Sequence, residues 1–334
     1  MNEVQTLAAK PWGRLYSVPK LNLGQAGGLL LVLIVLCGVM SIMTPNFATG
    51  LNATNLMRGA AVTIVLSVGM TLVLLTAGID LSIGAILAAG GVVYFDLGML
   101  GAPGPLALLG ALGAGVVLGS FNGYLIGRVG MSFFVVTLGT ASLYRGAVLL
   151  WTDNQTKDAY GDGFARSIGD SILVGIVPTP FVIAIAVLLI AAIALRYTIW
   201  GRSVYATGGN REAAEFSGID TGWIIMSVYA VSGLCAALAG VMVIGRSTIV
   251  LPSAGMGIEL QVAAAVLLGG AALSGGAGSV WGTLLGVVFL EVLRNVLNFA
   301  GVSSFWQLLL TGAILLCAVF LDRIREKRRS GSDF

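Results

Sequence analysis

Residues 59–77 read GAAVTIVLSVGMTLVLLTA, nineteen consecutive residues without a charge. A helix that crosses the hydrocarbon core of a membrane needs about 20 predominantly apolar residues. The whole chain has the same character, because 57% of its 334 residues are hydrophobic and only 10% are charged. Soluble domains carry roughly 25% charged residues. A soluble protein with so little charge could not cover its surface, so the sequence predicts an integral membrane protein.

Nine further apolar runs resemble this one, and together they predict an all-α protein with about ten transmembrane helices. A β-barrel is disfavoured because its strands alternate polar and apolar residues. The least regular runs are 82–100, which contains Asp96 and Gly98, and 258–273, which is short and ends among glycines. The expected spans are 24–43, 59–77, 82–100, 105–127, 132–151, 178–196, 222–244, 258–273, 280–298 and 305–321.

The basic residues predict the orientation, because the loops on the cytoplasmic side of a membrane protein are enriched in Lys and Arg. With a cytoplasmic N-terminus, twelve of the 18 basic residues fall inside and four outside. We therefore expect both termini in the cytoplasm of a multi-pass protein of the bacterial inner (plasma) membrane. The expected divisions are an N-terminal tail (1–23), a transmembrane domain (24–321) and a basic tail (322–334).

Several catalytic classes are excluded by what the sequence lacks. It has no histidine, and its three cysteines are scattered through apolar runs. Triads that use histidine, histidine metal sites and CxxC sites are therefore ruled out. No lysine stands in the glycine frame of a phosphate-binding P-loop. We expect no enzyme activity, no metal and no cofactor in this chain, and an ATP-driven process would need its motor in another subunit.

One segment between predicted spans, 197–221, contains a compact motif. Residues 201–219 read GRSVYATGGNREAAEFSGI. Asn210 is suited to cap a short helix over 211–217, and Gly218 is suited to end it. Such a helix could fit the groove of a partner protein. An ordinary connecting loop is the alternative interpretation.

This motif resembles a known family. Glu212-Ala213-Ala214, followed after three residues by Gly218, resembles the EAA–xxx–G loop of ABC importer permeases, and the full run resembles ribose/xylose/arabinose-type sugar permeases. Ordered blocks elsewhere resemble the same family: AGIDLSIG at 77–84, FNG at 121–123, TLGT at 137–140, RG at 145–146, GIEL at 257–260, LGG at 268–270, GSV at 278–280, NVLN at 295–298 and GVSS at 301–304.

The resemblance implies a type II ABC importer-like permease. Its expected partners are a second copy of the permease or a close paralogue, a tandem nucleotide-binding ATPase that holds ATP and Mg, and a periplasmic or lipoprotein sugar-binding protein. The expected substrate is a monosaccharide, with pentose, hexose and polyol all open; the lipid bilayer surrounds the chain, and no nucleic acid is expected. The resemblance implies coupling to the ATPase through Gly209, Asn210, Glu212, Ala213, Ala214 and Gly218.

Asp80 follows the second predicted span, and two interpretations of it stay open. Its carboxylate could cap the start of the third helix, or it could contact the ATPase. We include it among the coupling candidates.

The fifth span carries Thr137, Thr140 and Tyr144 on one helical face. Hydroxyls and a ring on one stripe suit a sugar, but they equally suit hydrogen bonds between helices. Asn122 of the preceding span joins these candidates for the substrate pathway. Arg145 lies on a neighbouring face, where a charge needs a partner or water.

The ninth span presents a second polar face with Glu291, Arg294, Asn295 and Asn298. At 1.5 Å per residue, Glu291 lies roughly 16 Å from the start of its helix, close to the membrane midplane. Glu291, Asn295 and Asn298 are further pathway candidates; a Glu291–Arg294 pair that neutralises itself is the alternative. Glu259 could face a vestibule or pair with Arg246.

The preferred hypothesis is a permease subunit of a sugar importer. The alternative is an ion-coupled secondary transporter, in which Glu291 and Asp80 would be the coupling carboxylates. A membrane enzyme is disfavoured because the chain lacks a catalytic dyad and a cluster of metal ligands.

Overall fold

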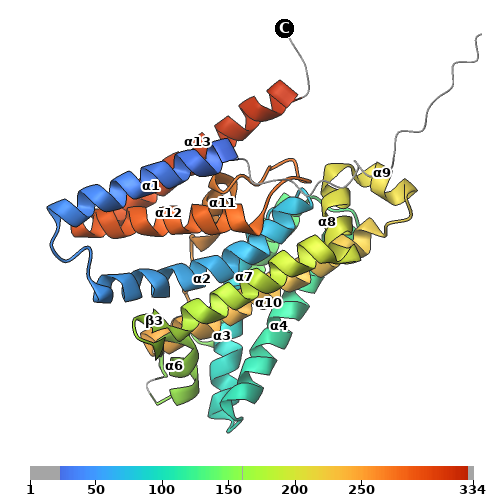
Figure 1. Ribbon diagram of the computed structural model, residues 1–334. Helices are drawn as coiled ribbons and strands as arrows, with labels where there is room; N and C mark the ends of the chain where they lie inside the picture. Colours follow the sequence, from blue (N-terminus) through green and yellow to red (C-terminus); the bar gives the residue numbers. More distant parts are fainter. Residues whose placement is uncertain (1–22, 160, 330–334) are drawn as a thin grey trace, which may run out of the picture.

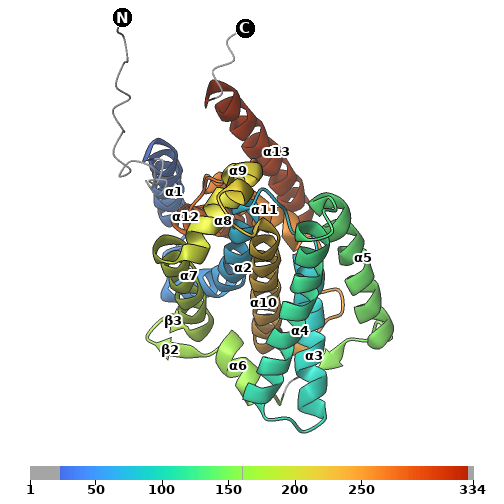
Figure 2. The ribbon, with the colours of Figure 1, turned by 90° about the vertical axis from the view of Figure 1, so that its right-hand side faces the viewer.

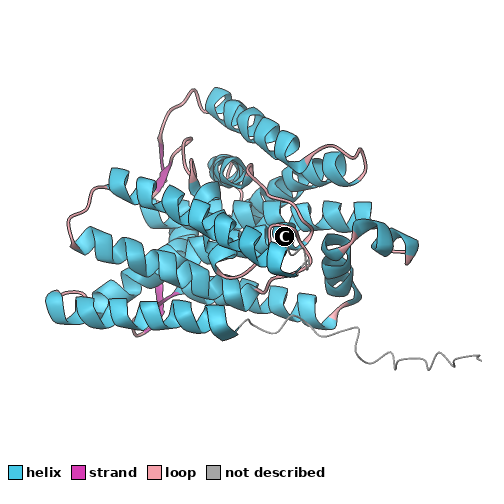
Figure 3. Ribbon diagram, turned by 90° about the horizontal axis from the view of Figure 1, so that it is seen from above, coloured by secondary structure: helices cyan, strands magenta, loops and turns pink. Residues whose placement is uncertain are grey.

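Each of the ten apolar runs folds as a helix in the computed structural model, which describes residues 23–159 and 161–329. Helices dominate the described part of the chain (Figure 3). The all-α class is thereby confirmed; the tail expected at 1–23 lies almost wholly outside the described residues. The ten helices are α1 (Leu23–Met43), α2 (Gly50–Leu75), α3 (Ile83–Met99), α4 (Gly104–Gly127), α5 (Phe133–Trp151), α7 (Thr179–Tyr197), α10 (Thr221–Ser247), α11 (Ile258–Leu268), α12 (Val280–Phe299) and α13 (Ser304–Arg329).

Six of these helices, namely α2, α4, α5, α7, α10 and α12, are long and apolar enough to cross a membrane. Shorter apolar stretches lie in α1, α3, α11 and α13. The expected span 258–273 is too long, because α11 stops at Leu268 and Gly270 then takes a positive φ of 92°. Helix α1 begins one residue before its expected span, whereas α13 extends past residue 321 into the expected basic tail.

Helices α2 and α10 form the buried centre of the molecule. Helix α4 packs against α10 through glycines spaced four residues apart: Gly115, Gly119, Gly123 and Gly127. A Cβ at any of the four would lie between 2.2 and 2.6 Å from the backbone of α10. Contacts between membrane helices commonly rely on such small residues, since lipid offers little hydrophobic drive for helix association. The high glycine content of the sequence thus serves close packing of the backbone.

Three short helices and four short strands connect the spans. Helices α8 (Ile199–Gly209) and α9 (Arg211–Phe216) lie at one end of the molecule, and α6 (Gly163–Gly169) lies at the other (Figures 1 and 2). Strands β2 (Ile172–Val174) and β3 (Val177–Pro178) form a hairpin beside α6, while β1 (Lys157–Asp158) pairs antiparallel with β4 (Ile249–Val250).

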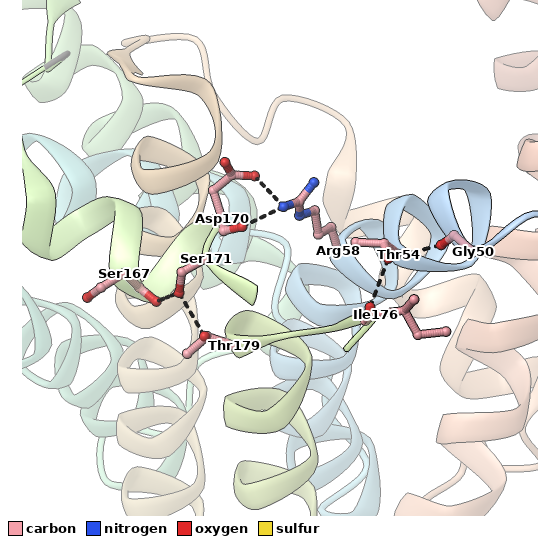
Figure 4. Close-up of polar contacts among 8 residues, drawn as sticks. All are labelled: Gly50, Thr54, Arg58, Ser167, Asp170, Ser171, Ile176 and Thr179. Atoms are coloured by element: carbon pink, nitrogen blue, oxygen red, sulfur yellow. Dashed lines mark hydrogen bonds and ion pairs between the residues drawn. The ribbon is translucent and has the colours of Figure 1, made fainter. Parts of the chain in front are cut away.

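The segment around α6 is fastened to α2 by polar contacts (Figure 4). Arg58 Nη2 donates to the backbone oxygen of Asp170 at 2.6 Å and lies 3.2 Å from its carboxylate. Thr54 Oγ1 donates to the backbone oxygen of Ile176 at 2.8 Å. These contacts hold the α6 end of the molecule in a fixed position relative to the buried centre.

Candidate functional site

The segment α8–α9 folds as the sequence predicts, with a short helix that is capped at both ends. Asn210 has φ −160° and ψ 104°, and its Oδ1 accepts from the backbone N–H of Ala213 at 2.9 Å. Glu212 stands in the first turn, where a negative charge is favourable beside the unpaired N–H groups of a helix.

Gly218 ends this helix with a φ of 82°, a conformation that costs a residue with a Cβ about 1–2 kcal/mol. The N–H of Ile219 donates to the oxygen of Ala214 at 3.0 Å, and the N–H of Gly218 donates to that of Glu215 at 2.9 Å. This pair of bonds is a Schellman motif, so a glycine at 218 has a direct structural reason.

One face of α9 is exposed among the residues that the structure describes. Glu212 and Ala213 are exposed, Ala214 is buried, and the side chain of Phe216 is 93% exposed. The helix projects from the end of the molecule (Figure 1). A projecting helix with an exposed ring is suited to insertion into a groove of a partner protein.

Hydrogen bonds fasten α9 to the ends of α4 and α10. Arg211 Nη2 donates to the backbone oxygen of Gly127 in α4 at 3.3 Å, and Arg211 also pairs with Glu215 within α9 at 3.1 Å. The ends of α4 and α10 are joined to each other by the pair Arg128–Asp220 at 2.7 Å. The hydroxyl of Thr221 donates to Glu215, and this bond, followed by that of Arg211, lowers the pKa of Glu215 below its ordinary value. The pKa of Asp220 is lowered as well, first by the backbone N–H of Trp223. A force applied to α9 would therefore reach two long helices.

Next to α9 lies a cavity of about 380 Å³, bounded by the end of α2, the α4–α5 connection, α8 and α10. Thr207 contributes a buried hydroxyl that has no hydrogen-bond partner among the described residues. The lining residues are Thr76, Ala77, Gly78, Ile126, Gly130, Met131, Ser132, Phe133, Thr207, Gly208, Gly209, Asn210, Arg211, Ile225 and Tyr229.

Asp80 does not lie on the surface of this end. It is fully buried, its Oδ1 accepts from the backbone N–H and the hydroxyl of Ser82 at 3.0 and 2.6 Å, and its Oδ2 accepts from Ser232 Oγ of α10 at 2.8 Å. A side chain with no exposed surface cannot touch a docked subunit in this conformation. Of the two interpretations of Asp80, this conformation favours the one at the start of the third helix, since the carboxylate holds the start of α3 against α10; the contact with an ATPase stays a prediction.

Two of the pathway candidates extend the same buried network. Asn122 Nδ2 donates to Ser82 Oγ at 2.8 Å, and the hydroxyl of Tyr144 lies 3.1 Å from Asn122 Oδ1. The network therefore links the start of α3 with α4, α5 and α10. The sequence missed Ser82 and Ser232, since single serines in apolar runs give no signal of their own.

Thr137 and Thr140 are buried too, and both bond to backbone oxygens. Thr137 Oγ1 bonds to Phe133 at 2.8 Å and to Ile79 at 3.3 Å, whereas Thr140 Oγ1 bonds to Val136 at 2.9 Å. The bonds to Phe133 and Val136 lie within α5, and only the bond to Ile79 leaves the helix. The stripe bonds to another helix through Tyr144, whose hydroxyl reaches α4.

Arg145 has the hydrogen-bond partners that a charged side chain within a membrane span requires. Its Nη1 donates to the backbone oxygens of Pro252 and Ala254 at 2.7 and 2.8 Å, and its Nη2 donates to that of Gly84 at 2.9 Å. The carboxylate of Glu259 lies beside the same glycine. Among the ion pairs of the described residues, none joins Glu259 to Arg246.

Glu291 lies between three helices rather than pairing along its own. Its Oε1 accepts from Thr63 Oγ1 of α2 at 2.7 Å and from Gln261 Nε2 of α11 at 3.3 Å. No ion pair within 4.0 Å joins it to Arg294 in the described part of the chain, although the two charges still interact at a longer distance. Hydroxyl and amide donors of neighbouring helices occupy the carboxylate.

The other two amides of this face also bond to neighbouring helices. Asn295 and Asn52 exchange two side-chain hydrogen bonds, of 2.8 and 3.1 Å. Asn298 Oδ1 accepts from Gln307 Nε2 of α13 at 2.7 Å. Asn52 could have been found from the sequence only by extending the second span to the start of α2, nine residues before the expected boundary at 59.

The glycine-rich bundle, with six helices long and apolar enough to cross a membrane, is that of a multi-pass membrane protein. The chain belongs to the permease family described as "Branched-chain amino acid transport system / permease component", whose model matches residues 52–319. The resemblance seen in the sequence blocks is thus confirmed.

Individual relatives are similar over most of their length. The ribose import permease protein RbsC of Bacillus subtilis is 40% identical over 297 residues, covering 89% of this chain and 92% of the relative. RbsC of Escherichia coli K12 is 37% identical over 306 residues, with 89% and 93% covered. The D-allose transport system permease protein AlsC of Escherichia coli K12 is 34% identical over 302 residues, with 90% and 92% covered. No solved structure shows significant similarity to the chain.

Proposed function

We propose that this chain is the permease subunit of an ATP-binding cassette importer that moves a monosaccharide into a bacterial cell. The observation that carries the proposal is the α8–α9 segment, whose exposed helix is fastened to α4 and α10. The names of the relatives support sugar as the class of substrate. The hydrolysis of ATP, with its Mg, belongs to a partner ATPase.

The basic residues support an orientation with the α8–α9 end, residues 1–23 and residues 322–334 in the cytoplasm. The α6 end then faces a periplasmic or lipid-anchored sugar-binding protein. A second copy of the chain, or a close paralogue, completes the pore. Gly209, Asn210, Glu212, Ala213, Ala214 and Gly218 form the coupling segment of this proposal.

Alternating access follows from this arrangement, because a ligand or motor can shift a two-state equilibrium only through contacts that differ between the states. Closure of the ATPase around ATP displaces α9. The bond from Arg211 to the backbone oxygen of Gly127 passes that displacement to α4, and the bond from Thr221 to Glu215 passes it to α10. The polar face that contains Glu291 and Asn295 remains the proposed part of the substrate pathway.

An ion-coupled transporter is the weaker candidate. Asp80, one of its two carboxylates, is fully occupied by Ser82 and Ser232. The matching family and relatives also favour the importer over an ion-coupled carrier.

Uptake by proteoliposomes tests the proposal. The chain is reconstituted with its ATPase, and uptake of a radiolabelled pentose, hexose or polyol is measured with the cognate binding protein present. We expect uptake of one of these sugars only when ATP, ATPase and binding protein are all present. Uptake of none of them by a folded, assembled complex would overturn the sugar assignment.

A further inference from the structure

The segment 251–279, here called the broken span, runs from β4 to the end of the molecule that holds α8, and its helix is too short to cross the membrane. That helix, α11, has 11 residues. At 1.5 Å per residue this is about 16 Å, roughly half the thickness of the hydrocarbon core. The flanking residues 251–257 and 269–279 therefore lie at membrane depth as non-helical backbone. Such backbone is tolerated only where protein buries it or where it lines a cavity.

One end of the broken span meets α8, directly before the coupling segment, at a junction of three backbones. The N–H of Gly276 donates to the oxygen of Leu75, the last residue of α2, at 3.0 Å. Gly208 of α8 lies against this bond, since a Cβ there would be 1.8 Å from that oxygen and 2.7 Å from the nitrogen of Gly276. A Cβ on Gly276 would in turn be 2.6 Å from the Cα of Gly209. No side chain separates the three backbones, so α8 cannot move toward α2 without displacing Gly276.

The other end is held by Arg145, which binds the oxygens of Pro252 and Ala254 and joins them to the start of α3 at Gly84. Here too the backbones touch, because a Cβ on Gly84 would be 2.2 Å from the oxygen of Gly255. Arg145 is therefore the main polar connection between residues 252–254 and the fixed bundle.

Between its ends, the broken span packs against α12 by backbone contact. A Cβ on Gly286 would be 2.0 Å from the oxygen of Ala265, and one on Gly282 would be 2.1 Å from that of Gly269. Gln261 adds a hydrogen bond of 3.3 Å to Glu291. Smooth glycine surfaces offer little side-chain interlocking to oppose a displacement along α12.

We propose that the broken span is a gate that moves with α8 and the coupling segment. The contact between Gly208 and Gly276 transmits the motion, and Arg145 positions the closed gate. The proposal rests on the proposed importer function and deepens it. Displacement of α8 by the ATPase shifts Gly276, the shift passes along α11, and residues 251–257 separate from α3 at Arg145.

Labelling of a single cysteine measures this movement. Met256 is 69% exposed within the gate, and Met99 is 72% exposed at the end of α3, outside it. In a variant whose three native cysteines are replaced by alanine, Met256→Cys and Met99→Cys are each labelled with a membrane-impermeant maleimide in the complex with the ATPase. We expect ATP to change the labelling rate at position 256 by about threefold or more and to leave position 99 unchanged, as expected for a population shift.

Gly208→Ala disrupts the contact with Gly276 through which the motion of α8 reaches the gate. We expect the complex to assemble and hydrolyse ATP, while uptake falls by about tenfold or more and position 256 no longer responds to ATP. Gly113→Ala is the matched control, because a Cβ at Gly113 meets no atom within 4 Å. An unchanged response at position 256 in Gly208→Ala would overturn the proposal.

Arg145→Lys supplies a second test, which does not depend on the folding of Gly208→Ala. Lysine keeps the charge but cannot bind the three oxygens with one planar group. We expect faster labelling at position 256 without ATP and reduced uptake with ATP hydrolysis retained. Unchanged labelling and uptake would contradict the role of Arg145. The unmutated complex separates the two hypotheses. If it takes up no sugar, the importer proposal fails. If it takes up sugar while the labelling rate at position 256 never responds to ATP, the gate proposal fails.

Discussion

Ser232 of α10 donates a hydrogen bond of 2.8 Å to Asp80 Oδ2, opposite the bonds that Ser82 makes to Oδ1. The carboxylate is thus held from two sides at the start of α3. Because Ser82 also accepts from Asn122, one buried group connects helices far apart in the sequence. In this conformation Asp80 is a structural centre of the bundle.

Asp80→Ala leaves the donors of Ser82 and Ser232 without their acceptor. Each buried polar group left unpaired costs about 1–3 kcal/mol, so we expect the alanine variant to unfold at a clearly lower temperature in detergent. Asp80→Asn keeps the shape and one acceptor oxygen, and is expected to lose less. Equal unfolding temperatures for the alanine variant and the unmutated protein would show that the network does not stabilise the bundle.

Phe216→Ala removes an exposed ring from α9. Surface substitutions usually change stability by less than about 0.5 kcal/mol, so the variant is expected to fold normally. Truncation of an aromatic anchor in an interface typically costs about 2 kcal/mol or more, which predicts weaker binding of the ATPase by over tenfold. Binding is measured by titration of the permease in nanodiscs. Leu100→Ala, at an 84% exposed residue near the opposite end, is the control; equal affinities for both variants would refute the docking role.

Gly218→Ala forces a side chain into a φ of 82°. We expect a local cost of about 1–2 kcal/mol, which frays the end of α9 while the bundle stays intact. Hydrogen exchange of Ala214 and Ile219 should accelerate, and uptake should fall with assembly retained. Gly139→Ala serves as the control, because a Cβ there meets no atom within 4 Å. Unaltered exchange and uptake would argue against the Schellman end as part of the coupling.

Acid should release α9 at a pH below the ordinary carboxyl range. The pKa values of Glu215 and Asp220 are lowered in the folded state by hydrogen bonds from Thr221 and from the N–H of Trp223, respectively. A lowered folded pKa contributes stability that is present above the unfolded value, near 4, and is lost as the pH falls through the folded pKa. An environment-sensitive fluorophore at Ser217→Cys should report a transition below pH 4 that Glu215→Gln removes, because Glu215 makes the bond from α9 to Thr221. A transition at the same pH in Glu215→Gln would assign the release to another group.

Hydrophobic length and caps were enough to predict most of the fold. The positions of the ten helices, and of the cap at Asn210 and the end at Gly218, all follow from local chemistry. The α11 run was predicted too long, because the glycines after Leu268 terminate the helix inside a stretch whose hydropathy alone suggests that it continues.

The partners of the polar side chains could not be predicted in the same way. Periodicity placed Thr137, Tyr144 and Glu291 on helix faces, but which neighbour each face meets depends on contacts between distant segments. A Glu291–Arg294 pair on one helix was an alternative that the sequence left open, whereas the structure gives Glu291 donors from α2 and α11. For Asp80 the sequence suggested a bond at the start of the third helix, which the structure shows, but it could not indicate the bond to Ser232 of α10.

The energy source of transport tests the central claim most directly. Proteoliposomes that contain the permease, its ATPase and the binding protein are loaded either with ATP or with a proton or sodium gradient, and sugar accumulation is followed in both. The account predicts accumulation with ATP, none with either gradient alone, and loss of the ATP-driven uptake when the ATPase is omitted. Accumulation by this chain alone under an ion gradient would contradict it.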